Sequence, residues 1–366
     1  MRLLFVASSE NRRGTEMHLV TLATALVAGG HEVAALVRPR SFLCRALRSS
    51  GVLIIAGGFR NALDPRGWLA LAAACSHWKP EWVAGSFAHE YWPTLLLGRR
   101  AGARVVLFRH MPAPLGQLTR RWVPRLADRF IAVSSFVRSQ LIATGVPAER
   151  VDVLHNPLDT GLFRPNPTER ARMRRELGVS DDSVVLGYVG TLAESKGVGF
   201  LARAVDEVAL AQPRLHALWV TTAPPAQQFL ESLRPGALSR HRFVGPCEDV
   251  ARYYNAMDAL AVPSQWPEPF GRVAIEGQAF GLPVLANRIG GLTEAFPEGA
   301  PLLTVGDAAA WRSAILNIVS LSPDERLRIG ERGRAFVMER FDMHTIATRF
   351  IELLSAADSG QREQFS

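Results

Sequence analysis

The sequence predicts an α/β protein made of two doubly wound, Rossmann-like domains that face one another across a cleft. Three observations support this prediction. The chain has 366 residues, more than one typical core accommodates. Short apolar runs alternate with stretches of helical spacing, which is typical of a parallel sheet covered on both faces. The alternation stops at a proline-rich segment and then restarts, as expected at a domain boundary.

In the first half, short apolar runs predict the strands of an N-terminal sheet. They lie at residues 2–7, 32–37, 52–55, 81–84, 104–108, 130–133 and 151–154. Stretches of helical spacing lie between them, among them residues 15–28 and 135–144. Strands joined through helices pair in parallel, because each crossover returns the chain to the same edge of the sheet.

A cluster of prolines separates the two halves. Pro157, Pro165 and Pro167 fall within eleven residues, too many for a continuing helix. We therefore assign residues 1–163 to an N-terminal domain and residues 164–343 to a C-terminal domain. Residues 344–366 contain a last helical segment that follows no strand, and we expect this helix to pack back on the N-terminal domain.

The alternation in the second half predicts a smaller sheet with its own helices. Strands are expected at residues 183–189, 215–220, 241–244, 258–262 and 283–286. Helices are expected at residues 196–211, 225–233, 248–256, 271–280, 307–319 and 323–339, with the last helix at 344–356. Ligands of such folds bind at the carboxyl ends of the strands, so functional side chains are sought there.

Charge is divided unevenly along the chain. Residues 1–165 contain 21 Lys and Arg against 10 Asp and Glu, a net of +11, whereas residues 166–366 contain 21 against 24, a net of −3. A basic half is suited to anionic lipid, nucleic acid or an acidic substrate. No helix-turn-helix, zinc or RNA-binding signature accompanies the charge, which disfavours nucleic acid as a partner.

Three further features restrict the class of protein. The three cysteines are far apart, so neither a disulfide framework nor a cysteine metal site is indicated. No apolar run reaches 18 residues, and the apolar start covers only about six residues. These features predict a cytoplasmic protein.

The segment 114–130 has the pattern of a basic amphipathic helix. Apolar side chains recur at intervals of four, and arginines recur likewise on a neighbouring face: Leu118, Trp122, Leu126, Arg121, Arg125 and Arg129. Two interpretations fit this pattern. The helix either lies on an anionic membrane surface or packs its apolar stripe against its own sheet.

The most informative segment follows the predicted strand 258–262. Pro267 and Pro269 hold an irregular loop that contains Glu268. Phe270 and Gly271 then open a helix that ends before Gly281. A loop leading from a buried strand into a helix start is a frequent site for phosphate groups.

The chemistry of this segment suits a nucleotide-sugar. We expect the backbone N–H groups at the helix start near Gly271, Arg272 and Val273 to receive a diphosphate. Glu268 and Glu276 offer paired acceptors for vicinal sugar hydroxyls. A second strand ends in a glycine turn that carries Lys196, one of only two lysines in the chain, which is placed to neutralise a leaving phosphate.

These motifs resemble glycosyltransferase family 4, whose members are retaining enzymes of the GT-B fold. The resemblance rests on the segment from Gly190 to Gly197, on Phe243-Val244-Gly245, and on Pro263-Ser264 followed by Glu268-Pro269-Phe270-Gly271 and Glu276. It extends to the first half through Arg129-Phe130-Ile131-Ala132-Val133-Ser134-Ser135 and Val153-Leu154-His155-Asn156-Pro157-Leu158-Asp159.

The resemblance implies a role for each matching residue. Glu268 would contact the transferred sugar, Glu276 the nucleotide ribose, and Lys196 the diphosphate. Gly14 would let the first loop approach the donor, and His110 would position the reacting sugar. Family members usually have an arginine where this chain has Thr191, which leaves more of the phosphate charge to Lys196 and the helix start.

We therefore expect a retaining glycosyltransferase that moves a hexose from a nucleotide-sugar, a UDP-sugar or GDP-mannose, to a glycan or lipid-linked acceptor in cell-envelope polysaccharide or lipopolysaccharide synthesis. The predicted catalytic residues are His110, Glu268 and Lys196, and Phe270 joins the predicted donor site. No Asp-x-Asp occurs, so we expect neither a metal nor another cofactor. The competing interpretations are a nucleotide-sugar epimerase and a sugar-binding protein without activity.

Overall fold

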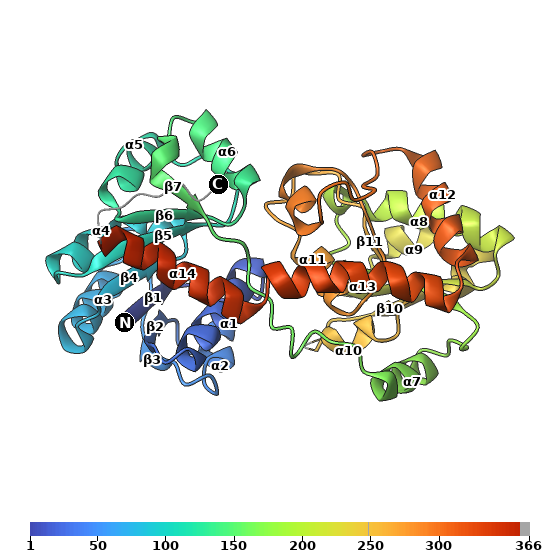
Figure 1. Cartoon of the computed structure of the whole chain (residues 1–366), viewed down its shortest axis with the longest axis horizontal. Helices are drawn as coiled ribbons and strands as arrows, with labels where there is room; N and C mark the ends of the chain where they lie inside the picture. Colours follow the sequence, from blue (N-terminus) through green and yellow to red (C-terminus); the bar gives the residue numbers. More distant parts are fainter. Residues whose placement is uncertain (248, 359–366) are drawn as a thin grey trace. The chain divides into compact units, whose positions relative to one another are not determined.

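The computed structural model describes residues 1–247 and 249–358. It divides the chain into two compact units (Figure 1). Unit 1 comprises Met1–Leu158 and the segment from Phe341 onward, and unit 2 comprises Asp159–Arg340. Each unit is built on one parallel sheet with helices beside it, so the predicted class of two doubly wound α/β domains is confirmed.

Unit 1 contains a seven-stranded sheet in the order β3-β2-β1-β4-β5-β6-β7. Its strands are β1 Arg2–Ala7, β2 Glu32–Val37, β3 Leu53–Ala56, β4 Trp82–Gly85, β5 Arg104–Arg109, β6 Arg129–Ala132 and β7 Val151–Val153. Its helices are α1 Gly14–Ala28, α2 Phe42–Ala46, α3 Pro65–Trp78, α4 Tyr91–Arg100, α5 Gln117–Leu126, α6 Ser135–Ala143 and α14 Met343–Asp358, with short 3-10 turns η1 Ala88–Glu90 and η2 Ala148–Arg150. The strand order reverses direction between β1 and β4.

Unit 2 contains a five-stranded sheet in the order β10-β9-β8-β11-β12. Its strands are β8 Val184–Gly190, β9 Leu215–Thr221, β10 His241–Val244, β11 Ala259–Val262 and β12 Val284–Ala286. Its helices are α7 Pro167–Glu176, α8 Val198–Ala211, α9 Gln227–Glu231, α10 Ala251–Tyr254, α11 Arg272–Ala279, α12 Ala308–Ser320 and α13 Pro323–Arg340, with 3-10 turns η3 Glu194–Lys196, η4 Pro235–Arg240 and η5 Gly290–Ala295. Here the order reverses between β8 and β11, the point at which doubly wound folds bind ligands.

The last helix belongs to unit 1. Helix α14 packs beside α1, and the Phe350 ring lies 6.4 Å from that of Phe5 and 5.6 Å from that of Phe108. The chain enters this helix through a bridge between Leu158 and Asp342. These apolar contacts bury one face of α14, a helix that follows no strand in the sequence.

The boundary drawn by the structure follows side-chain packing. Phe163, which the sequence places at the end of the first domain, packs its ring at 6.3 Å from Tyr254 and 6.1 Å from Phe280. The residues Asp159–Arg340 belong to unit 2, so unit 2 begins before Phe163 and ends before residue 343.

Three helices of unit 2 differ from their predicted bounds. The predicted helix 196–211 begins at Val198, because Gly197 takes a left-handed φ of +71° that ends the preceding turn. The helix expected at 225–233 is confined to α9, and the helix expected at 248–256 is confined to α10, with residue 248 outside the described residues.

Helix α7 is an addition to the predicted elements, since the prolines around residue 165 indicate a boundary segment and no helix. Pro167 instead occupies the first turn, where a missing N–H costs nothing. The Asn166 side chain accepts from the N–H of Glu169 over 3.1 Å and caps the helix.

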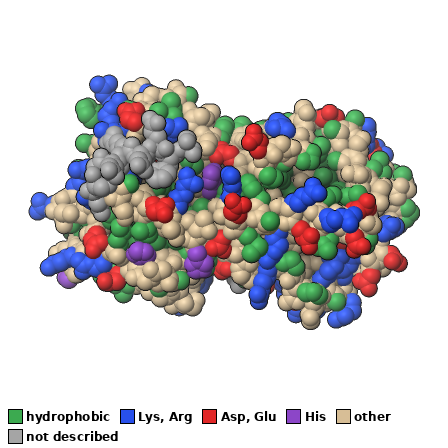
Figure 2. All heavy atoms as spheres, viewed as in Figure 1, with side chains coloured by type: hydrophobic (Ala, Val, Ile, Leu, Met, Phe, Trp, Pro, Cys, Tyr) green, Lys and Arg blue, Asp and Glu red, His purple; other side chains and the backbone are tan. Residues whose placement is uncertain are grey.

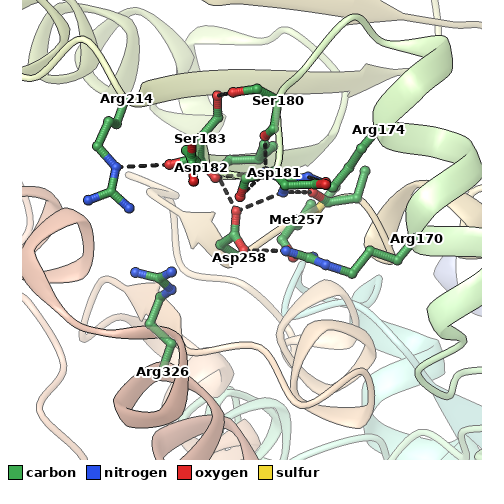
Figure 3. A network of polar contacts seen from close by, with 12 residues as sticks. Arg170, Arg174, Ser180, Asp181, Asp182, Ser183, Arg214, Met257, Asp258 and Arg326 are labelled. Carbon is green, nitrogen blue, oxygen red and sulfur yellow. Dashed lines mark hydrogen bonds and ion pairs between the residues drawn. The ribbon is translucent and has the colours of Figure 1, made fainter.

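A charged network ties α7 to the amino ends of the strands in unit 2 (Figure 3). Asp258, just before β11, accepts from Arg174 at 3.0 Å, from Arg170 at 2.6 Å and from the N–H of Val185 at 2.8 Å. The Arg174 side chain is 3% exposed and also donates to the carbonyls of Ser180 and Ser183 and of Ala256. The network fixes the edge of the sheet opposite the candidate site.

Candidate functional site

The candidate donor site lies where the strand order of unit 2 reverses. Lys196 stands in η3 directly after β8, and Glu268 stands in the loop after the neighbouring strand β11. Parallel neighbours end at the same edge of a sheet, so the two loops meet. The sequence prediction that placed Lys196 and Glu268 near one another is consistent with this topology.

Lys196 and Glu268 are in direct contact. Lys196 Nζ lies 2.6 Å from Glu268 Oε1. The Ser264 hydroxyl donates to the same oxygen over 2.5 Å, and the Lys196 ammonium stands 5.4 Å from the centre of the Trp266 ring. The Lys196 side chain is 30% exposed and that of Glu268 16%. An ammonium and a carboxylate thus share one partly open site.

Tight backbone contacts hold the two loops together. A Cβ on Gly197 would lie 2.1 Å from the carbonyl oxygen of Pro263, and Gly197 also has a positive φ. The N–H of Gln265 donates to the carbonyl of Ser195 over 2.9 Å. Only glycine fits at position 197, which explains why Lys196 is followed by this residue.

A glycine pair holds the other end of Glu268. The N–H of Gly291 donates to the Glu268 carbonyl over 2.7 Å. Gly290 has a φ of +54°, and a Cβ there would lie 2.7 Å from the same carbonyl oxygen. The backbone that carries Glu268 is therefore fixed by close approach of η5.

Glu276 lies on the buried side of α11 with both carboxylate oxygens engaged. Arg272 Nε lies 2.9 Å from Oε1, and the Tyr254 hydroxyl donates to Oε2 over 2.8 Å. The residue is only 6% exposed. Burial, followed by the charge of Glu276, raises the pKa of Tyr254 well above its ordinary value, so the phenol remains a donor at all ordinary pH values.

The start of α11 is built as the sequence predicts. The helix begins at Arg272, so the backbone N–H groups of its first turn point toward its amino end. Phe270 is 3% exposed and anchors the loop in the core. Gly271 has an additional reason to be glycine, because a Cβ there would lie 2.7 Å from Leu292 and 2.9 Å from Ala295.

The two predicted residues of unit 1 lie at the carboxyl edge of its sheet. Gly14 is the first residue of α1, and a Cβ there would meet nothing within 4 Å, so packing does not require glycine at this position. His110 follows β5, and its ring lies 4.9 Å from that of His18. Burial, with the charges of His18 and Arg109, lowers the pKa of His110 well below its ordinary value and keeps the ring neutral.

Sequence reasoning did not assign roles to three residues of the donor site. Ser264 and Trp266 lie inside the motif segment, and Tyr254 lies outside it in α10. The Gly290-Gly291 pair was a readable signal, since adjacent glycines between elements mark close backbone approach. Within residues 1–247 and 249–358, no three His, Cys, Asp or Glu side chains gather closely enough to hold a metal ion.

Comparison with known families assigns both halves of the chain. Residues 12–162 match the family described as Glycosyltransferase Family 4, and residues 183–320 match the family described as Glycosyl transferases group 1. The chain belongs to glycosyltransferase family 4. The two matched ranges fall almost wholly within unit 1 and unit 2 respectively, so the family assignment covers both sheets.

Curated relatives of this family 4 chain include two glycosyltransferases from other bacteria. The D-inositol 3-phosphate glycosyltransferase of Nocardia farcinica is 33% identical over 246 residues, which cover 63% of this chain and 53% of that protein. The GDP-mannose-dependent alpha-(1-6)-phosphatidylinositol monomannoside mannosyltransferase of Mycolicibacterium smegmatis is 29% identical, covering 74% and 75%. The chain spans about half the length of the first of these relatives.

Solved structures share the fold of this family 4 chain over nearly its whole length. Anabaena HepE, solved in complex with UDP and glucose, has a TM-score of 0.80 at 24% identity and covers 97% of this chain and 100% of its own. A glycosyltransferase from Rickettsia africae has a TM-score of 0.86 at 19% identity, covering 98% and 99%. These likenesses establish the GT-B fold.

Proposed function

We propose that the chain is a retaining, metal-independent glycosyltransferase that moves a hexose from a nucleotide-sugar to a glycan or lipid-linked acceptor. The observation that carries the proposal is the contact between Lys196 and Glu268 at the reversal point of a GT-B donor-type sheet. A cation for a leaving phosphate and an acceptor for sugar hydroxyls are the two groups that such a donor requires at its anomeric carbon.

Each residue has a role in this proposal. The diphosphate lies at the start of α11, where the N–H groups of Arg272 and Val273 receive it, and Lys196 neutralises the charge that develops on the leaving oxygen. Glu268 accepts from hydroxyls of the transferred sugar, and Glu276 accepts from the ribose. His110, held neutral, positions the reacting sugar by hydrogen bonding without adding positive charge to the acceptor side.

We include metal independence in the proposal because groups of the chain itself provide positive charge for the leaving diphosphate. Lys196 and the helix start together supply the electrostatic stabilisation that a divalent ion gives in other transferases. The donor is a UDP-sugar or GDP-mannose. A relative of this chain that is named for GDP-mannose supports including the second class in any screen.

The acceptor side is proposed to lie at an anionic membrane surface. On α5, the side chains of Leu118, Trp122 and Leu126 are 71%, 45% and 39% exposed, so the apolar stripe does not pack on its own sheet. The interpretation that this stripe forms part of the core is therefore wrong. The helix packs instead through Val123 and Pro124, which are buried.

Basic residues accompany the exposed stripe of α5. Arg121 and Arg125 belong to the same helix, and the Arg121 guanidinium lies 5.6 Å from the Trp122 ring centre. On the face drawn in Figure 2, basic and acidic side chains are interspersed over both units. The proposed contact with anionic lipid therefore rests on the local arginines and exposed apolar side chains of α5. Within the described residues no helix is long and apolar enough to cross a bilayer.

The proposal is tested first by a donor screen. The purified chain is heated with UDP-, GDP-, ADP- and dTDP-sugars in the presence of EDTA, and hydrolysis is followed by NMR of the released sugar. We expect one nucleotide class to raise the melting temperature and to release the sugar with its anomeric configuration retained. Conversion of the donor to an epimer would favour an epimerase, and no stabilisation by any donor would contradict the donor-site assignment.

A further inference from the structure

We propose that Ser264 keeps the Glu268 carboxylate oriented when the diphosphate of the nucleotide-sugar attracts Lys196 away from it. We propose further that Glu268 contacts the transferred sugar through Oε2. This inference rests on the proposed function of the same site. In the structure, Oε1 of Glu268 accepts from Ser264 Oγ at 2.5 Å and from Lys196 Nζ at 2.6 Å. Among the described residues none donates a hydrogen bond to Oε2.

The two side chains that donate hydrogen bonds to Oε1 respond differently to a bound nucleotide-sugar. Lys196 is an ammonium on a flexible stem, 30% exposed, and a diphosphate with two negative charges competes for it more strongly than one carboxylate does. Ser264 is 3% exposed and neutral, so a phosphate has no comparable hold on it. When Lys196 turns to the diphosphate, Ser264 is the contact that remains on Oε1.

The Ser264 hydroxyl is itself held in place through its backbone. The amide of Asn287 donates to the carbonyls of Pro263 and Ser264, each over 3.0 Å. Asn287 is fully buried, and its own oxygen accepts from the Trp311 indole over 2.8 Å. A chain of hydrogen bonds therefore connects the core of α12 to the serine, whose hydroxyl is preorganised toward the carboxylate.

The backbone of Glu268 is fixed independently by Gly290 and Gly291. With both ends of the serine–glutamate contact anchored, the carboxylate plane is set before the donor arrives. Oε2 then faces the remaining open side of the carboxylate, where hydroxyls of a hexose can donate to it. Loss of the serine hydroxyl leaves Glu268 in place but frees its side-chain torsions once Lys196 departs.

The test separates turnover from nucleotide binding. Ser264→Ala, Ser264→Thr and wild-type full-length chains are compared with UDP-glucose and GDP-mannose for turnover, and with UDP and GDP for equilibrium binding, all in EDTA. We expect Ser264→Ala to lower kcat about 10- to 100-fold, the range that misplacement of a positioned group produces. The dissociation constant of the nucleoside diphosphate, which has no sugar, should stay within about twofold, and Ser264→Thr should recover most of the loss.

A matched control is available on the same sheet. Ser183 is 7% exposed and lies just before β8, at the edge opposite the donor site. Ser183→Ala makes the same chemical change and should leave kcat unchanged. Should Ser264→Ala fail to fold, Ser264→Cys, with a weaker donor of similar size, replaces it and is expected to give an intermediate loss.

Two outcomes would overturn the inference. One is an unchanged kcat in Ser264→Ala, and the other is an equal weakening of nucleoside diphosphate binding and turnover, which a merely structural serine would produce. Glu268→Gln in the same assay distinguishes these from failure of the proposed function. If Glu268→Gln retains full turnover, the donor-site assignment itself is wrong. If Glu268→Gln loses turnover while Ser264→Ala keeps the wild-type rate, only the proposed role of the serine is wrong.

Discussion

The hydroxyl of Tyr254 donates to Oε2 of Glu276 over 2.8 Å, and the two residues come from different helices of unit 2. Because Arg272 engages Oε1 of the same carboxylate, Glu276 is held at both oxygens before any ligand arrives. In the proposed function, a carboxylate fixed in this way meets the ribose already positioned and need not be ordered by it.

Replacing Tyr254 with phenylalanine should therefore weaken both the fold and nucleotide binding. The buried carboxylate loses one donor, which we expect to lower the free energy of unfolding by about 1–3 kcal/mol. Binding of the nucleoside diphosphate should weaken several-fold, because Glu276 is no longer fixed. Urea unfolding and titration with UDP or GDP measure the two effects, and unchanged nucleotide affinity would argue against a ribose role for Glu276.

The network around Asp258 should contribute strongly to the stability of unit 2. In Asp258→Asn, the Arg174 guanidinium, 3% exposed, loses its buried charged partner and keeps only the exposed Asp181 at 4.0 Å. Breaking a buried pair in this way costs about 3–5 kcal/mol. The control is Arg172→Ala, which removes an exposed pair with Glu169 on the same helix and should change the unfolding midpoint far less. Similar unfolding midpoints for the two variants would contradict the network's role.

Much of the fold could be predicted from the sequence because its strands are buried on both faces. Runs such as residues 2–7 and 104–108 coincide closely with β1 and β5, since a continuous apolar run between helical stretches has few other interpretations. Helix α7 could not be separated from the linker, because the same proline that ends one helix can begin another.

The residues of the candidate site were easier to name than their contacts. The loop prolines and the helix start point to Glu268, and the glycine turn after the preceding strand points to Lys196, as members of one predicted site. Their direct pairing depends on the approach of loops 72 residues apart, which backbone contacts of Gly197 and Gly290 bring about. The role of Ser264 as a shared donor is equally a property of the folded loop, and local spacing carries no signal for it.

Glu90 should make the stability of unit 1 depend on pH. Its carboxyl is fully buried and accepts from the N–H groups of Ser8 at 2.5 Å and Phe87 at 3.2 Å. Burial raises the pKa of Glu90 from its ordinary value of 4.5 to about 7. The folded state therefore binds more protons than the unfolded state between about pH 4.5 and 7. As a result, the contribution of Glu90 to the free energy of unfolding falls as pH rises through that window.

The variant Glu90→Gln isolates this effect. The full loss on ionisation corresponds to about 3 kcal/mol, so the variant should gain stability relative to wild type as pH rises from 5 to 8. His89, whose ring lies 3.8 Å from Glu90 and whose pKa is lowered by burial, gives a slope of opposite sign but is present in both proteins. Parallel curves of unfolding midpoint against pH for the two proteins would contradict the assignment.

The α5 surface should bind anionic vesicles in a salt-dependent way. We expect the chain to sediment with vesicles that contain phosphatidylglycerol, but not with pure phosphatidylcholine, and binding should fall as salt rises. The double variant Leu118→Gln with Trp122→Gln should bind at least about tenfold more weakly, since both side chains lose apolar contact. Leu63→Gln, at a position 86% exposed outside α5, is the control. Vesicle binding that does not change with salt, or that is equally strong in the double variant, would contradict the membrane role.

The central claim is that Lys196 and Glu268 act together on a nucleotide-sugar without a metal. The most direct test measures turnover of the donor selected by the screen, in EDTA, for wild type, Lys196→Ala and Glu268→Gln. Loss of one oxyanion-stabilising group typically lowers kcat by about 10²–10³. The account predicts a loss of that order in each variant while wild-type turnover is unaffected by EDTA. Wild-type activity abolished by EDTA, or variants that turn over at the wild-type rate, would contradict it.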